Sequence, residues 1–168
     1  GTLLIVATFG RRRFGEETAK WATLILASSM FFMLIGRMFI PDPLLIFFLT
    51  AALFAFWESM EGDWRWRLAT AFCLGMATLA KGPMPAAIFI ALLVYVVWKM
   101  PEKRPSLRSG WMLGTVIYLA VVAAWFVPVL LQRGPEFFSD FILRQNIGRL
   151  QGTDEAHAGP FWLYVPVV

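Results

Sequence analysis

Asp42 stands between two prolines, at the point where a long apolar run begins. A carboxylate in that place could act as a general base, as a cation ligand, or as a hydrogen-bond acceptor for a polar substrate. It could equally cap the helix that follows, since the first N–H groups of a helix lack partners within it. Both roles stay open from the residues alone. Arg37, five residues earlier in the chain, is a candidate ion-pair partner.

Lys81 follows the apolar pair Leu79–Ala80 and precedes Gly82 and Pro83. In so short a turn, its ammonium group could bind a phosphate, and Gly82 would allow the backbone to approach that ligand closely. The alternative is a lysine whose long side chain simply reaches from an apolar segment to water.

The segment 132–160 combines apolar residues at roughly helical spacing with polar ones, and it predicts an amphipathic helix lying along a membrane surface. Asn146 and Arg149 lie among the polar residues. Arg149 could hold a lipid phosphate through two parallel hydrogen bonds, a geometry that arginine favours. The alternative is an arginine exposed at the interface without a ligand.

His157 is the only histidine. It could bind a metal or a phosphate, or cap the apolar run that follows. One histidine predicts no metal cluster, so the residues alone leave any metal ligands unknown and a divalent ion an open alternative. The sequence contains no Walker loop, dinucleotide fingerprint, nucleophile elbow or HExxH motif.

The elements that must position these residues are membrane helices. Of 168 residues, 59% are apolar and only 15% are charged, whereas soluble domains carry about 25% charged residues. The run 109–132 holds no charge, and about 20 apolar residues suffice to span a bilayer. We therefore predict an all-α, polytopic transmembrane bundle. A soluble core of buried helices is disfavoured, because too many apolar blocks lack a polar face.

Hydropathy and helix breakers divide the chain into apolar spans joined by polar loops at 10–20, 60–67 and 99–109. Both ends of the chain lie inside apolar runs, so we interpret residues 1–168 as an internal fragment of one multi-span domain, truncated at both ends. The predicted spans are a partial one ending near Phe9, then Trp21 to Phe39, Pro43 to Ser59, Leu68 to Ala80, Met84 to Trp98, Gly110 to Leu131, and a last one beginning near Phe161.

Basic residues sort onto one side of this arrangement. Alternate loops collect ten of the fifteen lysines and arginines on the side of 10–20, 58–67 and 99–109, and five on the other. Lysine and arginine favour the cytoplasmic side, so the first group is predicted to be cytoplasmic. The net charge of +4 then needs no nucleic acid to explain it. The candidate site residues fall on the extracytoplasmic side: Arg37, Asp42, Lys81, Arg149 and His157.

Four motifs in this order resemble the polyprenyl-phosphate-sugar glycosyltransferases, the family of protein mannosyltransferases and the lipid A aminoarabinose transferase. The stretch 37–48, RMFIPDPLLIFF, resembles their second acidic motif, and 79–83, LAKGP, their Lys-Gly turn. FFSDFILRQNIGRL at 137–150 is similar to their interfacial segment. HAGPFWLY at 157–164 matches their His-x-x-Pro-Phe-Trp-Tyr-Tyr signature, with Leu163 in place of the first Tyr.

The resemblance implies a membrane glycosyltransferase of the GT-C type, active on the periplasmic side of a bacterial inner membrane. The donor would be a sugar on undecaprenyl or dolichyl phosphate, and the acceptor a protein, lipid A or a glycan. Asp42 matches the acidic residue near the transfer centre, and Lys81 and Arg149 match basic positions near the donor phosphate. Arg37, Asn146 and His157 would support them.

The resemblance further implies inversion at the anomeric carbon. We expect the family's first acidic motif upstream of Gly1, and we therefore expect residues 1–168 alone to be inactive. The main alternative is a transporter or flippase that uses Asp42, Lys81 and Arg149 as a polar pathway. A transporter should carry charges near the middle of the bilayer, whereas these lie at one interface. A third alternative, a structural membrane scaffold, would leave the one-sided charges unexplained.

Overall fold

The computed structural model describes residues 1–38, 40–60, 63–99 and 109–134, and all regular structure within them is helical. This confirms the all-α prediction. The chain divides into two units, Gly1–Trp125 and Phe126–Val168. The seven described helices are α1 (Thr2–Phe14), α2 (Glu16–Ser28), α3 (Met30–Arg37), α4 (Asp42–Ser59), α5 (Trp64–Lys81), α6 (Met84–Lys99) and α7 (Ser109–Arg133).

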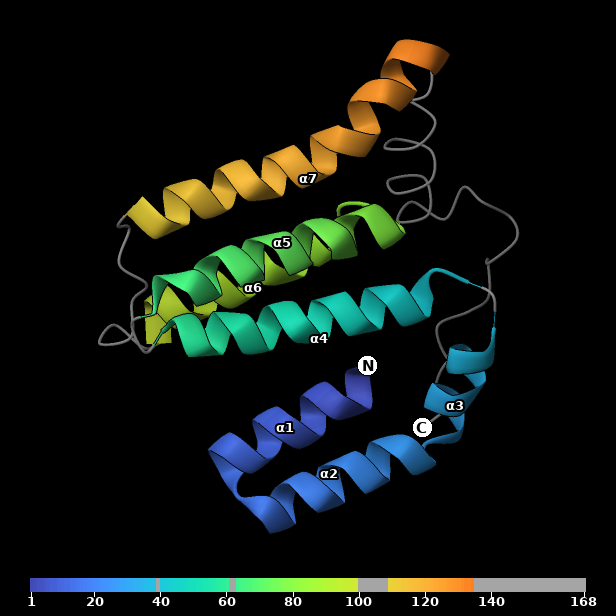
Figure 1. The fold of residues 1–168 in the computed structure, drawn as a ribbon, viewed down its shortest axis with the longest axis vertical. Helices are drawn as coiled ribbons and strands as arrows, with labels where there is room; N and C mark the ends of the chain where they lie inside the picture. The colour runs from blue at the N-terminus through green and yellow to red at the C-terminus, as the bar shows by residue number, and fades with distance from the viewer. Residues whose placement is uncertain (39, 61–62, 100–108, 135–168) are drawn as a thin grey trace. The chain divides into compact units, whose positions relative to one another are not determined.

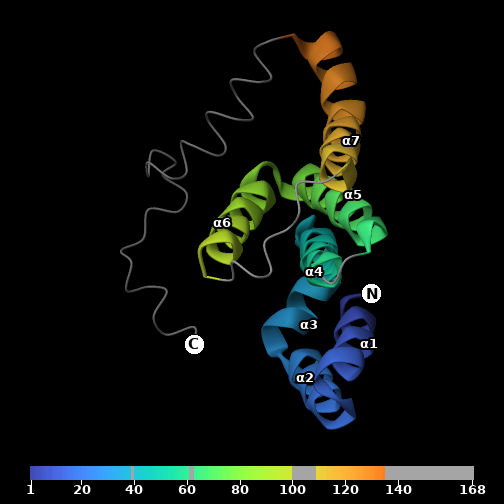
Figure 2. The same ribbon diagram turned by 90° about the vertical axis from the view of Figure 1, so that its left-hand side faces the viewer.

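Helices α1 and α2 form a tight antiparallel hairpin (Figures 1 and 2). The predicted loop at 10–20 is wrong, because α1 continues to Phe14 and only Gly15, with φ +89°, separates it from α2. Arginines at 11–13 favour the end of a helix, and Glu16 and Glu17 favour the start of the next. Gly10 lets the two helices approach, since a Cβ there would lie 3.1 Å from the Ala19 Cβ.

The predicted single span from Trp21 to Phe39 is broken in two. Helices α2 and α3 meet at Ser29, whose backbone is extended, and their axes differ by 62°. Serine pairs are a recognised cause of sharp kinks, and the Ser28 Oγ donates to the Ile25 carbonyl at 3.1 Å. Together α2 and α3 are long and apolar enough for one broken span or a re-entrant loop.

Helices α4 and α5 pack antiparallel and carry much of the core. Phe56 of α4 contacts Phe89 of α6 and Trp111 of α7 through ring edges, at centroid distances of 5.1 and 5.9 Å. The polar loop expected at 60–67 is shorter than predicted, because α5 begins at Trp64. Asp63 caps that helix by accepting from the Arg65 N–H at 2.9 Å.

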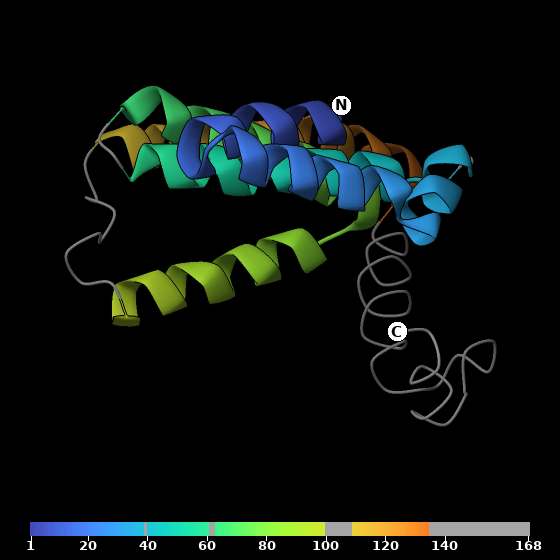
Figure 3. The ribbon, with the colours of Figure 1, turned by 90° about the horizontal axis from the view of Figure 1, so that it is seen from below.

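Glycines bring α7 against α5. A Cβ on Gly75 would lie 2.9 Å from Val121 Cγ1, and one on Gly114 would lie 3.4 Å from the Ala71 Cβ. Small residues at such contacts are typical of membrane helices, where close backbone approach replaces a hydrophobic driving force. Helix α6 contacts α5 and lies to one side of the layer that contains α4 and α5 (Figure 3).

Two described helices meet the length and composition of a membrane span: α4, and α7 from Gly110 to Arg133. The bent pair α2–α3 would make a third. These helices confirm the prediction of several spans, and the bounds predicted for α4, α6 and α7 agree with the structure within two residues. Helix α6 is apolar but has only 16 residues.

Apart from α3, which continues α2 after the bend, successive helices alternate in direction, which sorts their ends into two groups (Figure 1). One group, which we name the basic end, holds the Phe14–Glu16 and Ser59–Trp64 connections and the residues Lys99 and Ser109. The other, the opposite end, holds the Arg37–Asp42 and Lys81–Met84 connections. The grouping agrees with the alternation of loops predicted from the sequence.

Candidate functional site at the start of α4

Asp42 and Lys81 meet at the opposite end. Asp42 is the first residue of α4 and Lys81 the last of α5. The Lys81 Nζ donates to Asp42 Oδ1, across 39 positions of sequence. The Asp42 side chain is 26% exposed and that of Lys81 is 44% exposed. The two residues singled out for chemistry therefore form one charged pair that water and ligands can reach.

The structure does not place Asp42 as the cap of α4. Pro41 is the N-cap of α4, and no side chain makes a capping hydrogen bond there. Asp42 lies within the first turn, so its carboxylate is directed to Lys81 and not to the backbone. Arg37, at the end of α3, is exposed. The expected Asp42–Arg37 pair is not seen among the residues that the structure describes.

Prolines and one glycine fix this geometry locally. The Pro41 carbonyl accepts from the N–H groups of Leu44 and Leu45 at 3.1 and 3.0 Å, which starts α4 at Asp42. Gly82, with φ +84°, donates to the Thr78 carbonyl at 2.7 Å and ends α5 directly after Lys81. A residue with a side chain would be strained in that left-handed conformation.

The helix ends favour both charges of the pair. The N-terminus of a helix carries partial positive charge and its C-terminus partial negative charge. Asp42 is at the N-terminus of α4, and Lys81 is at the C-terminus of α5. Each charge is therefore stabilised by its own helix as well as by its partner. Such a pair can open toward a ligand without leaving either charge uncompensated.

The remaining predicted site residues, Asn146, Arg149 and His157, lie outside the described residues. Across the described ranges, no group of three or more histidine, cysteine, aspartate or glutamate side chains is placed to hold a metal ion.

Sequence reasoning missed a second charged pair, at the basic end. Arg13 of α1 donates through Nε to Glu58 Oε1 of α4 at 3.0 Å, and its Nη2 contacts Oε2. The side chains are 19% and 7% exposed. The one signal in the sequence was Glu58 itself, a carboxylate that directly follows an apolar run ending at Trp57. Its partner lies 45 residues away in the sequence.

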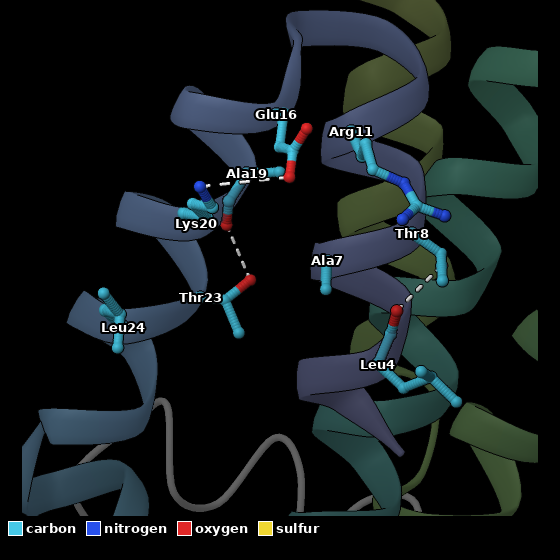
Figure 4. A pocket seen from close by; sticks show the side chains of 9 residues that line it. All are labelled: Leu4, Ala7, Thr8, Arg11, Glu16, Ala19, Lys20, Thr23 and Leu24. Carbon is cyan, nitrogen blue, oxygen red and sulfur yellow. Dashed lines mark hydrogen bonds and ion pairs between the residues drawn. The ribbon is translucent and has the colours of Figure 1, made fainter.

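Several hollows adjoin these helices. One of about 560 Å³ lies between α1 and α2 (Figure 4), where the Thr8 and Thr23 hydroxyls are bonded to carbonyls of their own helices. Charged side chains of Arg11, Glu16 and Lys20 lie at the hairpin end of this hollow. A second, of about 400 Å³, adjoins the start of α4 and includes Pro43 and Phe47 in its lining. Pro43, in the lining of the second hollow, directly follows Asp42 in the sequence.

Comparison with known proteins identifies the chain's family. Residues 2–135 match the family model of dolichyl-phosphate-mannose-protein mannosyltransferase. The chain belongs to this family. The match contains both Asp42 and Lys81, together with every described helix. The family assignment confirms the resemblance read from the sequence motifs.

The curated relatives have related names. The chain is 25% identical over 160 residues to an undecaprenyl phosphate-alpha-4-amino-4-deoxy-L-arabinose arabinosyl transferase of Erwinia tasmaniensis, covering 91% of the chain and 28% of the relative. A second transferase of that name, from Sodalis glossinidius, is 28% identical over 88% of the chain and 27% of the relative. An uncharacterized protein of Aquifex aeolicus is 24% identical over the whole chain and 37% of the relative.

The chain thus spans between about a quarter and two fifths of the length of these relatives. No solved structure matches the chain.

Proposed function

We propose that this chain is part of a membrane glycosyltransferase that moves a sugar from a polyprenyl-phosphate donor to a protein, lipid A or glycan acceptor on the extracytoplasmic side. The observation that carries the proposal is the Asp42–Lys81 pair, held at one end of adjacent helices inside the region that matches the family. Membership in a family named for a dolichyl-phosphate sugar supports the donor class, and relatives named for undecaprenyl phosphate support it further.

Lys81 is suited to the donor's phosphate. An ammonium group has three N–H donors, and Asp42 takes one of them. The others can reach a phosphate oxygen, on a side chain that is 44% exposed. When the bond from the anomeric carbon to the phosphate oxygen breaks, the leaving group keeps the electron pair. A cation held at that oxygen stabilises the developing negative charge.

Asp42 is suited to the acceptor. Its Oδ1 accepts from Lys81, which leaves Oδ2 to receive a hydrogen bond from the acceptor's hydroxyl or amine. As the acceptor atom bonds to the anomeric carbon, the carboxylate takes or orients its proton. Lys81 would thus bind the donor's phosphate and Asp42 the acceptor, and the inversion expected from the resemblance requires the acceptor to attack the anomeric carbon on the face opposite that phosphate.

The position of the charges favours a transferase over a transporter or flippase. Within the described helices, all Asp, Glu, Lys and Arg residues lie within five residues of a helix end. Charges that line a transport pathway are expected deeper in the membrane, facing the bundle interior. The described helices therefore offer a charged site at an interface.

The test of the function is sugar transfer by the full-length protein with Lys81→Ala. Turnover of a polyprenyl-phosphate sugar should fall by about a hundredfold or more, because the leaving phosphate loses a cation. Lys81→Arg, which keeps the charge, should recover part of that loss. Lys99→Ala is the matched control, since Lys99 also ends a helix but at the basic end. Normal turnover in Lys81→Ala would refute the phosphate assignment.

The side of the membrane is testable by cysteine labelling. In a Cys73→Ala background, Arg37→Cys at the opposite end should react with a membrane-impermeant maleimide in intact cells. Arg65→Cys at the basic end should react only after the membrane is permeabilised, since basic residues favour the cytoplasm. The reverse pattern would overturn the assignment of the active side.

A further inference from the structure

Arg67 is a buried arginine that the proposed reaction does not use. It lies in the first turn of α5 and is 8% exposed. Among the described residues, no hydrogen-bond acceptor reaches its Nε. Among the described carboxylates, the two nearest to Arg67 in the sequence have other partners: Asp63 accepts from the Arg65 N–H and Glu58 from Arg13. A buried, charged N–H donor without an acceptor is costly, so this position favours a negatively charged partner.

The Arg67 side chain lies against the start of α7. A Cβ built on Gly110 would be 3.3 Å from Arg67 Cδ and 3.5 Å from its Nη1, so the glycine lets the Arg67 side chain pack closely against α7. The first N–H groups of α7 lack partners within the helix, and its first turn contains no acidic residue. The N-terminus of a helix together with a buried arginine makes a strong anion site.

A second buried donor lies in the same turn of α7. The indole Nε1 of Trp111 is buried, and it too has no acceptor within the described part of the chain. The ring of Trp111 packs edge-on against Phe56, which fixes its position in the core. Two unpartnered buried donors of different kinds, adjacent to one helix N-terminus, point to a ligand with several acceptor oxygens.

We propose that Arg67, Trp111 and the first turn of α7 bind the phosphate group of an anionic phospholipid from the leaflet at the basic end. The phosphate offers the acceptor oxygens that the guanidinium, the indole and the helix N–H groups require. The lipid source follows from the surroundings. Trp64 is 50% exposed beside Gly110, as expected of an interfacial tryptophan, and exposed Arg65 adds positive charge near it.

The site is separate from the Asp42–Lys81 pair, because Arg67 and Lys81 stand near opposite ends of α5. It therefore does not depend on the proposed transfer reaction. A lipid bound there would join the starts of α5 and α7 where Gly110 packs against Trp64 and Arg67.

The experiment is native mass spectrometry of the full-length protein in detergent, with phosphatidylglycerol or phosphatidylcholine added at equal concentration. We expect the wild-type protein to retain phosphatidylglycerol preferentially, and Arg67→Gln to lower that retention by about tenfold or more. Arg11→Gln is the control, an exposed arginine in the last turn of α1 that takes no part in the proposed site, and should change retention by less than about twofold. Trp111→Phe, which keeps the ring but removes the N–H, should give an intermediate loss.

Three results would overturn the proposal. Equal retention of the two lipids by the wild-type protein would exclude an anionic headgroup, and this measurement needs no variant to fold. Unchanged retention in a folded Arg67→Gln protein would exclude the arginine. Complete displacement of phosphatidylglycerol by millimolar inorganic phosphate would show that the site takes the free anion and not the lipid.

Discussion

Helix α4 takes part in an ion pair at each of its ends, and the two pairs differ in almost every physical respect. At the basic end, Glu58 is 7% exposed and is held by two guanidinium nitrogens of Arg13. At the opposite end, Asp42 is 26% exposed and is paired with the single ammonium of Lys81, itself 44% exposed. One pair is largely buried and has two contacts between its partners, whereas the other is partly exposed and has one.

This difference separates a structural role from a functional one. A buried carboxylate with a forked arginine partner has both oxygens engaged, and removing either partner leaves an unpaired charge inside the protein. An exposed lysine–aspartate pair contributes little to stability but leaves donors and acceptors within reach of a substrate. The same helix thus binds α1 at one end and, in the proposed function, presents the groups that contact substrate at the other.

The largest expected effect on stability comes from Arg13→Ala. It should lower the free energy of unfolding by about 3–5 kcal/mol, because Glu58 is left buried without its partner. The measurement is denaturant unfolding of the full-length protein in detergent. Arg12→Ala, an exposed neighbour in the same turn of α1, is the control and should change stability by less than about 0.5 kcal/mol.

A double substitution sharpens this result. Arg13→Met combined with Glu58→Leu replaces both charges by apolar side chains of similar length, and such replacements are often neutral. Recovery of most of the lost stability would attribute the effect of Arg13→Ala to the unpaired carboxylate. If Arg13→Ala behaved like Arg12→Ala, the contrast between the two ends of α4 would fail.

Asp42→Asn should give the next largest effect, and on turnover instead of stability. We expect a fall of about a hundredfold, because the amide cannot take a proton from the acceptor. Asp63→Asn is the matched control, an aspartate at the start of α5 at the basic end. Equal turnover in both variants would contradict a catalytic role for Asp42.

Hydropathy and helix breakers predicted much of this fold. The bounds of α4, α6 and α7 follow from long uncharged runs between prolines, glycines and basic residues. The loop predicted at 10–20 is helical instead, because arginine and glutamate lower hydropathy yet favour helix formation. The bend at Ser29 was missed since its cause is local hydrogen bonding, which a hydropathy average does not record.

The sequence predicted which residues form the candidate site but not which of them contact one another. Proline and glycine neighbours singled out Asp42 and Lys81, and counting basic residues predicted that both lie on one side. The choice of Lys81 over Arg37 as the partner required the antiparallel packing of α4 and α5, which brings together residues 39 positions apart. The Arg13–Glu58 pair was missed for the same reason, since no local pattern links positions in α1 and α4.

The smallest effect expected is the coupling between Asp42 and Lys81 in stability. A double-mutant cycle of Asp42→Ala and Lys81→Ala should give less than about 1 kcal/mol, as for other exposed pairs. The value should fall as salt is raised from low to about 0.5 M, because mobile ions screen charges that water reaches. Unfolding of the two single variants and the double variant supplies the measurement.

The same cycle at the basic end distinguishes the two pairs. The coupling between Arg13 and Glu58 should change little over that range of salt, because burial excludes the screening ions. A coupling of several kcal/mol between Asp42 and Lys81, insensitive to salt, would make that pair a structural fastening like the other. The exposed carboxylate and ammonium would then be too tightly bound to each other to exchange partners with a substrate.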